Sequence, residues 1–257
     1  MSNLMQGKRG LIMGLANDRS LAWGIAQALH AHGAELAISY QGEVMEKRVR
    51  PLAEQLGCDF LIDCDVATEE ALDDAFARLS ARWPTIDFIV HAIAYANKDE
   101  LTGRFINTSL EGFHTAMHIS CYSFISVMRR AEKMMPDGGA ALTLSYIGAQ
   151  RVIPSYNVMG VAKAALEAST RYLAADLGEQ KIRVNAISAG PMRTLAGAVI
   201  GSSRDTYKRA AEASPLKKNP ELEDIGGAAL YLLSDLSKAV TGEVHFVDGG
   251  FHASGMC

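Results

Sequence analysis

Tyr156 and Lys163 carry chemistry of their own and stand seven positions apart in the segment Tyr-Asn-Val-Met-Gly-Val-Ala-Lys. A tyrosine hydroxyl can donate a hydrogen bond to an oxygen that gains negative charge during a reaction. A nearby lysine can favour that charge and can also bind the ribose of a nicotinamide cofactor. The pair is therefore a candidate site for chemistry on an oxygen that gains negative charge, and neither group needs a metal.

The spacing of the pair predicts that both side chains share one face of a helix. We expect this helix at Ser155–Gly178, where seven residues make about two turns and separate the side chains by roughly 10 Å along the axis. On an arbitrary helix, a packed tyrosine and an exposed lysine would be the more common arrangement. The position of the pair after the fifth predicted strand favours the catalytic interpretation.

The elements that must position this pair alternate along the whole chain, without a linker or an internal repeat. Seven mostly continuous apolar runs predict strands that are covered on both faces, as in parallel sheets. These runs are Gly10–Gly14, Glu35–Tyr40, Asp59–Asp63, Ile86–Ile93, Ala140–Ser145, Ile182–Ser188 and Glu243–Val247. We therefore expect an α/β fold, a single-domain Rossmann-like doubly wound parallel sheet of about seven strands over residues 1–257.

Helices between these strands have readable ends. Ser20 can cap a helix over Leu21–His32 that Gly33 ends. Thr68, followed by two glutamates, suits the start of another helix. Further helices are expected at about Ser109–Lys133, Ser155–Gly178 and Glu221–Ser234. Ligands of doubly wound sheets bind beyond the carboxyl ends of the strands, so we expect the site there.

The composition argues against several classes of function. The chain has 257 residues, of which 49% are hydrophobic and 21% charged, and it can bury a large core. A formal net charge of -4 and the absence of a long Lys/Arg run argue against nucleic acid as a partner. No apolar stretch reaches the roughly 18 to 20 residues of a membrane span, nor does the N-terminus resemble a secretory signal. We therefore expect a cytoplasmic protein without a membrane partner.

Residue types that bind metals show no metal-site spacing. The four cysteines are Cys58, Cys64, Cys121 and Cys257. They form neither a CxxC pair nor the spacing of a zinc site, so free thiols are expected. His114 and His118 stand one helical turn apart, but their segment lacks the glutamate of an HExxH motif. We expect no metal, and we expect packing or surface positions for both histidines.

The first turn of the chain, from Gly14 to Ser20, has features of a phosphate-binding turn. Gly14 can turn the chain tightly, and Ser20 with the first helix amides, beginning at Leu21, can donate to a pyrophosphate. Gly24 would permit close packing of this helix on a strand. The pattern is not GxGxxG, and such a turn alone is often a simple connection. Its place as the first strand-helix turn favours dinucleotide binding.

The end of the second predicted strand bears on the choice of cofactor. An acidic side chain here usually binds the adenosine ribose diol, whereas an arginine favours a 2′-phosphate. Gln41 can bind a diol without positive charge, which favours NADH/NAD+ over NADPH. Lys47 and Arg48 follow one turn later and weaken this preference. Alternatively, Gln41 is a solvated turn residue, since glutamine is ordinarily exposed.

Two more strand ends fall at the same predicted edge. Asp65 could bind the adenine amino group, and Val66 could form an apolar wall for its ring. A strand-end aspartate is also often only a helix cap. After the fourth strand, the run from His91 to Ala94 has small residues that would let the backbone approach a cofactor closely. The shared edge of these turns is the stronger argument for a cofactor.

The pattern of Tyr146, Tyr156 and Lys163 resembles the short-chain dehydrogenase/reductase superfamily and, within it, the bacterial enoyl-acyl carrier protein reductases. Ordinary members of the superfamily place the lysine four residues after the tyrosine, where this chain has Gly160. The similarity covers most of the chain. Other matching segments are 14–25, 40–41, 65–66, 184–194, 234–237 and 247–251.

This resemblance implies NADH-dependent reduction of the trans-2 double bond of enoyl-acyl carrier protein, the last reductive step of the fatty acid elongation cycle. It implies catalytic roles for Tyr146, Tyr156 and Lys163, with both tyrosines and Ala96 beside the substrate. It also implies a homotetramer, and closed symmetry is common among soluble oligomers. The cofactor contacts that it adds are Ile93, Lys163, Met192, Arg193, Thr194, Leu195 and Ala196. Ala92 and Ala94 depart from the more usual Ser and Gly, which puts the fine geometry near the nicotinamide in question.

The segment at about 194–210 is expected to be a mobile lid over the substrate. Residues 195–200 are apolar and have glycines and serines around them, which suits a cover that excludes water from an acyl chain. A core helix is the alternative. The basic residues Arg204, Lys208 and Arg209 could attract an acidic acyl carrier protein, or they could form a solvated helix face.

Two rival functions fit parts of the same pattern. A carbonyl or alcohol oxidoreductase of the superfamily would use its tyrosine to protonate an alkoxide, but the seven-residue spacing argues against it. A noncatalytic dinucleotide-binding sensor would keep the fold without the chemistry. Retention of both Tyr156 and Lys163 argues against the sensor.

Overall fold

A computed structural model of the protein describes residues 3–194 and 203–254. These residues form one parallel sheet of seven strands in the order β3-β2-β1-β4-β5-β6-β7. The strands are β1 (Arg9–Met13), β2 (Glu35–Tyr40), β3 (Leu61–Asp63), β4 (Phe88–His91), β5 (Gly139–Ser145), β6 (Ile182–Ala189) and β7 (Val244–Val247). The predicted doubly wound α/β fold is confirmed, and each predicted strand is present with ends that differ by at most two residues.

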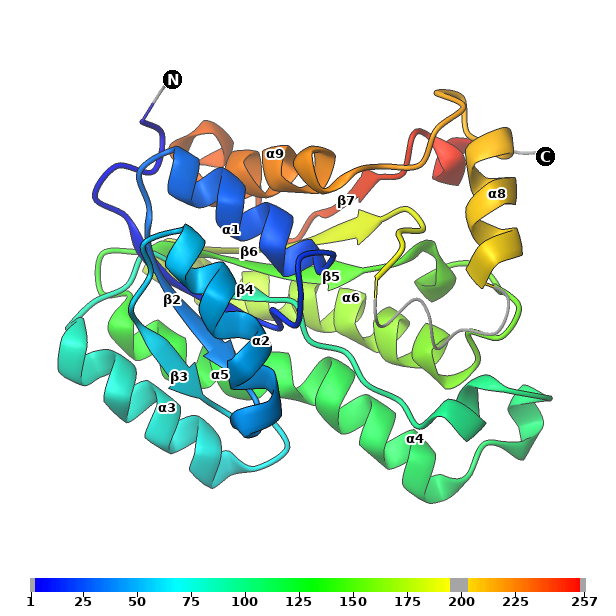
Figure 1. Ribbon diagram of the computed structural model, residues 1–257, viewed down its shortest axis with the longest axis horizontal. Coiled ribbons are helices and arrows are strands. Elements are labelled where there is room, and N and C mark those ends of the chain that lie inside the picture. Colours follow the sequence, from blue (N-terminus) through cyan, green and yellow to red (C-terminus); the bar gives the residue numbers. More distant parts are fainter. Residues whose placement is uncertain (1–2, 195–202, 255–257) are drawn as a thin grey trace.

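Helices cover both faces of the sheet (Figure 1). One face carries α1 (Leu21–Ala31), α2 (Gly42–Gln55) and α9 (Leu222–Leu233). The other carries α3 (Glu69–Arg82), α5 (Ser123–Ala131) and α6 (Val158–Leu177). The central strands are therefore buried on both sides, which explains why their sequences are continuously apolar instead of alternating.

All carboxyl ends of the strands point to one edge, because every strand pair is parallel. The register pairs Met13 with His91 and Ser145 with Ser188 at this edge. In Figure 1, α8 (Ser203–Ala213) and the turns at 98–107 lie on the side to which β6 points. The segments that follow β1, β2, β3, β4, β5 and β6 therefore start from a common edge.

Two of the predicted helix ends are confirmed in detail. Gly33 follows α1 with a φ of +95°, a conformation that glycine adopts without the strain of a side chain. Thr68 accepts a hydrogen bond from the Ala71 N–H at 3.3 Å and so caps α3. These ends depend on local chemistry, and that is why the sequence alone predicts them.

The expected cap by Ser20 is wrong in its contacts. Ser20 does stand directly before α1, but its side chain makes no hydrogen bond to the helix. Its Oγ instead accepts the N–H groups of Ala16 at 3.1 Å and Asn17 at 3.0 Å. The serine therefore shapes the turn after β1, and the helix amides are left for another partner.

Gly24 serves helix-helix contact instead of the predicted helix-strand contact. A Cβ at Gly24 would lie 2.5 Å from the carbonyl oxygen of Leu222 in α9. A Cβ at Gly226, also in α9, would lie 2.6 Å from the Gly24 carbonyl oxygen. The two glycines therefore allow α1 and α9 to cross at close range.

The predicted helix Ser109–Lys133 is present but interrupted by a wider turn. It consists of α4 (Leu110–Met117), a π-turn at His118–Tyr122 and α5. Such turns insert an extra residue into a helix and often occur at functional sites. By contrast, α2 was not predicted, since its many charged residues obscure a narrow stripe formed by Val49 and Ala53.

Candidate active site

Tyr156 lies in the turn before α6, so the prediction that it shares a helix with Lys163 is wrong. The helix begins at Val158, and the Met159 N–H donates to the Tyr156 carbonyl oxygen at 3.0 Å. Ser155 and Asn157 on either side have φ angles of 60° and 40°. Left-handed backbone at non-glycine residues is costly and persists where the surroundings enforce it. The turn therefore sets the direction of the Tyr156 side chain.

Two glycines make room for the Tyr156 ring. A Cβ at Gly148 would lie 2.4 Å from the ring, at Cδ1. A Cβ at Gly160 would lie 2.9 Å from the Gly148 carbonyl oxygen. Since atoms cannot approach this closely, the contact accounts for glycine at the position where ordinary members of the superfamily carry lysine. The buried amine is instead supplied from Lys163, less than one turn further along α6.

Tyr146 and Tyr156 pack edge to face beside the small residues after β4. Their ring centroids are 5.0 Å apart, with an angle of 73° between the planes. Ala94 and Ala96 contact the same apolar cluster, so the structure brings together the three residues predicted at the substrate. The cluster forms an apolar wall around two phenol groups.

Burial keeps both phenols protonated. It raises the pKa of Tyr146 to about 12. It raises the pKa of Tyr156 further, and the potentials of Tyr146 and Glu167 add to the effect. Both hydroxyls are therefore hydrogen-bond donors at neutral pH, which suits the stabilisation of a developing oxyanion.

Lys163 is buried against the end of β5. Only 6% of its surface is exposed, and its Nζ donates to the Leu144 carbonyl oxygen at 2.7 Å. Burial lowers the pKa of Lys163 to about 8, while Cys121 and Glu167 act in the opposite direction. The amine is therefore mostly charged at pH 7 and supplies positive potential where water cannot screen it.

His91 joins the helices and strands behind this lysine, a role that the sequence analysis missed. Its Nε2 lies 2.8 Å from Ser123 Oγ, and its Nδ1 lies 3.3 Å from Thr143 Oγ1. Burial, followed by the charge of Lys163, lowers the pKa of His91 to about 3. The imidazole is thus neutral and holds β4, β5 and α5 together by hydrogen bonds.

Ser120, in the π-turn, fixes the segment that follows β4. Its Oγ accepts the Tyr95 N–H at 2.9 Å and donates to the Tyr95 carbonyl oxygen at 3.0 Å. These bonds hold the backbone between Ile93 and Ala96, both of which are predicted site residues. The role of Ser120 could not be predicted from the sequence, because its partner lies 25 residues away.

The dinucleotide side of the edge is shaped mainly by backbone. Gly14 has a φ of +95°, and a Cβ there would lie 2.2 Å from the Ala92 carbonyl oxygen. Close approach of two chain segments therefore requires this glycine. Ser20 and the half-buried Leu21 follow at the start of α1, whose first amides are free of a side-chain cap. This cradle fits a pyrophosphate group.

The three residues predicted to bind the adenosine half differ in their exposure and contacts. They are Gln41, Asp65 and Val66. Gln41 is exposed and directly precedes α2. Asp65 accepts the Ala67 N–H at 2.9 Å through Oδ1. This bond shapes the turn before α3 and is not the helix cap named as the alternative, because Thr68 caps that helix. Val66 is 6% exposed and packs in the core between the sheet and α3. The polar side chains of Gln41 and Asp65 next to the apolar Val66 would suit an adenosine group.

The segment after β6 is described only as far as Thr194. Met192 packs against the core, and the Thr194 N–H donates to the Met192 carbonyl oxygen at 2.9 Å. The guanidinium of Arg193 lies 4.9 Å from the centre of the Tyr207 ring in α8. Two predicted cofactor contacts, Leu195 and Ala196, lie outside the described residues.

The predicted lid also lies partly outside the described residues, at 195–202. Its second part belongs to α8, which begins at Ser203. Lys208 and Arg209 are exposed on this helix, and Lys208 pairs with Glu212 at 3.7 Å. Lys208 is therefore exposed to solvent and paired within its own helix, as on an ordinary solvated helix face.

Residues 3–194 and 203–254 contain no group of three or more His, Cys, Asp or Glu side chains arranged to hold a metal ion. Three free cysteines, Cys58, Cys64 and Cys121, are buried, and burial raises the pKa of each thiol. Across the same residues, every helix is too short or too polar to cross a membrane.

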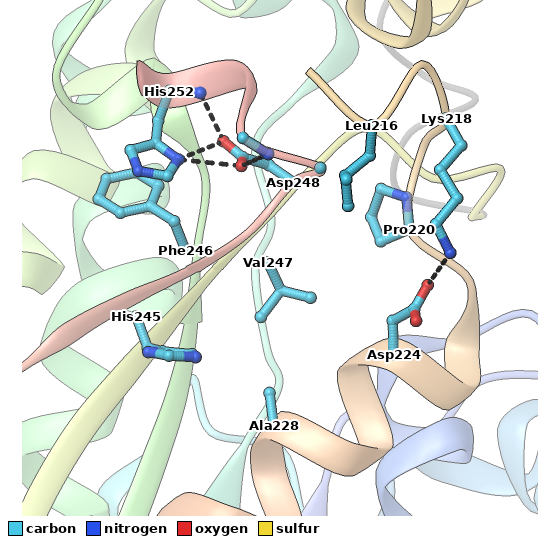
Figure 2. A pocket seen from close by; sticks show the side chains of 12 residues that line it. Leu216, Lys218, Pro220, Asp224, Ala228, His245, Phe246, Val247, Asp248 and His252 are labelled. Atoms are coloured by element: carbon cyan, nitrogen blue, oxygen red, sulfur yellow. Dashed lines mark hydrogen bonds and ion pairs between the residues drawn. The ribbon is translucent and has the colours of Figure 1, made fainter. Parts of the chain in front are cut away.

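A separate cavity of about 390 Å³ lies between β7, the start of α9 and the loop before it (Figure 2). Two pairs of its polar groups are already matched: Lys218 pairs with Asp224 at 3.5 Å, and His252 Nδ1 lies 2.9 Å from Asp248 Oδ1. The predicted site residues are not among those that line it. The tyrosine-lysine centre therefore remains the better candidate for chemistry.

Comparisons with known proteins agree on one family. The sequence profile described as enoyl-(acyl carrier protein) reductase matches residues 14–252. An NADH-dependent enoyl-[acyl-carrier-protein] reductase of Rickettsia felis is 54% identical over 99% of this chain and 98% of its own. A reductase structure from Anaplasma phagocytophilum in complex with NAD is 55% identical, with a TM-score of 0.97 over 100% of this chain and 98% of its own. A structure from Candidatus Liberibacter asiaticus has a TM-score of 0.98 at 55% identity, over 100% and 99% of the two chains.

Proposed function

The chain belongs to the enoyl-(acyl carrier protein) reductase family, and on this premise we propose that it uses NADH to reduce the trans-2 double bond of enoyl-acyl carrier protein. The product is a saturated acyl-acyl carrier protein, so the reaction is the last reductive step of the fatty acid elongation cycle. The observation that carries the proposal is the buried pair of Tyr156 and Lys163, with glycine at position 160.

Tyr156 stabilises the negative charge that forms on the substrate. When bound, NADH supplies a hydride to C3 of the enoyl thioester, which moves negative charge to the thioester oxygen. The Tyr156 hydroxyl keeps its proton because burial raises its pKa, and it donates a hydrogen bond to that oxygen. Transfer of one proton from water to C2 then completes the saturated product.

Lys163 and Tyr146 support this step in different ways. The Lys163 ammonium provides positive potential in a buried setting and binds the nicotinamide ribose. Its bond to the Leu144 carbonyl oxygen fixes the direction of the amine. Tyr146 packs its ring against Tyr156 and shapes the substrate wall together with Ala96. The small alanine leaves room for the substrate beside the two rings.

The remaining residues of the edge hold the cofactor. Gly14, Ser20 and Leu21 would hold the pyrophosphate, and Gln41 would bind the ribose diol. Asp65 and Val66 would hold the adenine, and Ile93 with the segment Met192–Ala196 would hold the nicotinamide half. The lack of an added positive charge at Gln41 supports NADH as the preferred cofactor over NADPH.

The substrate carrier and the assembly form a further part of the proposal. We propose one reductase domain with a substrate-binding lid at 194–210, whose basic residues Arg204, Lys208 and Arg209 attract the acidic carrier protein. The homotetramer and the cytoplasmic location implied by the family remain predictions. Light scattering of the purified protein would show four times the chain mass for a tetramer.

The function is tested by following NADH oxidation with a trans-2-enoyl thioester and a 3-ketoacyl thioester side by side. The proposal predicts turnover of the enoyl substrate and little or none of the ketone. Activity on the ketone alone would identify a carbonyl reductase. Cofactor binding without turnover of either substrate would identify a dinucleotide sensor.

A further inference from the structure

Glu167 is a buried acid next to the catalytic lysine, and the proposed reaction does not use it. It stands four residues after Lys163, so both side chains leave the same face of α6 one turn apart. Only 4% of its surface is exposed. A charged group rarely occupies such a position without specific partners.

The partners of Glu167 lie at both ends of one short segment. The Ser145 hydroxyl donates to Oε1 at 2.6 Å, and the Gln150 amide donates to Oε2 at 3.3 Å. Both carboxylate oxygens therefore act as acceptors. The segment 145–150 contains Tyr146 and also Gly148, which contacts the Tyr156 ring.

We infer that Glu167 is a positioning residue that clamps the segment 145–150 around the two tyrosines and keeps Lys163 charged. The inference rests on the proposed function and deepens it, because it assigns the support of all three catalytic groups to one carboxylate. If the bonds from Ser145 and Gln150 to Glu167 were lost, Tyr146 would move together with Gly148, which packs against the Tyr156 ring.

Several charged or titratable groups face Lys163 from the elements packed around it. His91 approaches from β4 as a neutral imidazole, and Cys121 approaches from the π-turn. Burial raises the pKa of the Cys121 thiol, so it is uncharged at neutral pH. Tyr156, on the turn before α6, also keeps its proton. Within the described part of the chain, Glu167 is thus the anion among the groups that act on Lys163.

The test uses full-length Glu167→Gln protein, which keeps an acceptor for Ser145 but removes the charge. NADH affinity and enoyl turnover are measured from pH 6 to 10. NADH affinity and turnover should both fall as pH rises and Lys163 loses its proton. In the variant this fall should occur about one pH unit lower, because the negative charge that favours the Lys163 ammonium is gone. Turnover at pH 7 should fall about tenfold as the segment loosens. An unchanged pH profile would overturn the electrostatic part of the inference.

Two further variants separate charge from support. Glu167→Asp keeps the charge with a shorter reach, so it should lower turnover while its pH profile stays near that of the wild type. Wild-type turnover in this variant would overturn the clamp, even if Glu167→Gln failed to fold. Glu179→Gln, an exposed change just after α6, should alter neither quantity.

NADH affinity also distinguishes failure of this inference from failure of the proposed function. If wild-type protein binds NADH but reduces no enoyl thioester, the function is wrong. The pH dependence of NADH affinity in Glu167→Gln still reports on Lys163 in that case. An unchanged affinity profile then counts against Glu167 itself.

Discussion

The two halves of the site are built in different ways. On the dinucleotide side, Gln41 is exposed and Gly14 acts through its backbone. On the catalytic side, Tyr156, Lys163 and Glu167 are each at most 7% exposed. The side chains of Lys163 and Glu167 reach from α6 to the end of β5. In the proposed site, cofactor binding therefore draws on several separate turns, whereas the chemistry depends on a few side chains that are buried together.

Burial explains why we expect substitutions in the catalytic half to have larger effects than those on the dinucleotide side. A charge or dipole that is removed from water acts strongly on its neighbours, and an unmatched group there is costly. Lys163 and Glu167 are matched by specific partners, the Leu144 carbonyl oxygen and the Ser145 hydroxyl. Exposed groups on the dinucleotide side exchange protein contacts for water at little cost.

The largest effect is expected from Lys163→Met. Removal of the buried charge should lower turnover by about a thousandfold and should also weaken NADH binding, because one group serves both roles. Steady-state rates and NADH fluorescence titration measure the two effects. Lys133→Met, an exposed change, provides the control. Unchanged NADH affinity in Lys163→Met would contradict the ribose assignment.

Gly160→Ala tests whether the catalytic half is as tightly packed as the contacts indicate. The added methyl would lie 2.9 Å from a backbone oxygen and should reduce the free energy of unfolding by about 1 to 3 kcal/mol. Urea denaturation measures the change. Gly227→Ala in α9 has open space around the new methyl and should raise stability by about 0.5 to 1 kcal/mol. Equal effects of the two changes would refute the packing argument.

Acid should weaken the catalytic half through His91. Its pKa is about 3 in the folded protein and 6.5 as the reference value. The unfolded chain therefore binds a proton first, and stability is lost as pH falls below 6.5, by about 1.4 kcal/mol per unit. Glutamine does not titrate, so the free energy of unfolding of His91→Gln should fall less between pH 7 and pH 5 than that of the wild type. Parallel urea curves for both proteins at pH 7, 6 and 5 would show the difference, and identical losses would disprove the role of His91.

The smallest effect is expected on the dinucleotide side, from Gln41→Ala. Loss of one exposed hydrogen bond should weaken NADH binding by about 2- to 5-fold, without a change in turnover at saturating NADH. Gln41→Arg should in addition improve the affinity for NADPH relative to NADH. If neither variant changes the affinity for either cofactor, Gln41 is a solvated turn residue.

The fold could be predicted from the sequence because its signals are local and repeated. Continuous apolar runs predicted seven strands, and the repeated strand-helix-strand order predicted right-handed crossovers in a doubly wound sheet. The turn after β1 and the acid after β3 were predicted to lie at one edge, and the structure places them there. A parallel sheet brings these ends together whatever the side chains are.

The support of the catalytic groups could not be predicted, because it depends on contacts between distant residues. Ser145 meets Glu167 across 22 positions, and His91 meets Thr143 across 52. The turn that carries Tyr156 depends on left-handed backbone at its neighbours, for which the sequence has no glycine signal. The spacing of the tyrosine and lysine was thus recognised, although the helix inferred for both was wrong.

The most direct test of the account is the turnover of Tyr156→Phe at saturating NADH, with NADH affinity measured on the same protein. The buried hydroxyl is assigned to the substrate oxygen, so turnover should fall by about 100-fold or more, while NADH affinity changes less than about twofold. Tyr172→Phe, an exposed change on α6, should have wild-type turnover. A Tyr156→Phe protein that binds NADH and reduces the enoyl thioester at the wild-type rate would contradict the assignment.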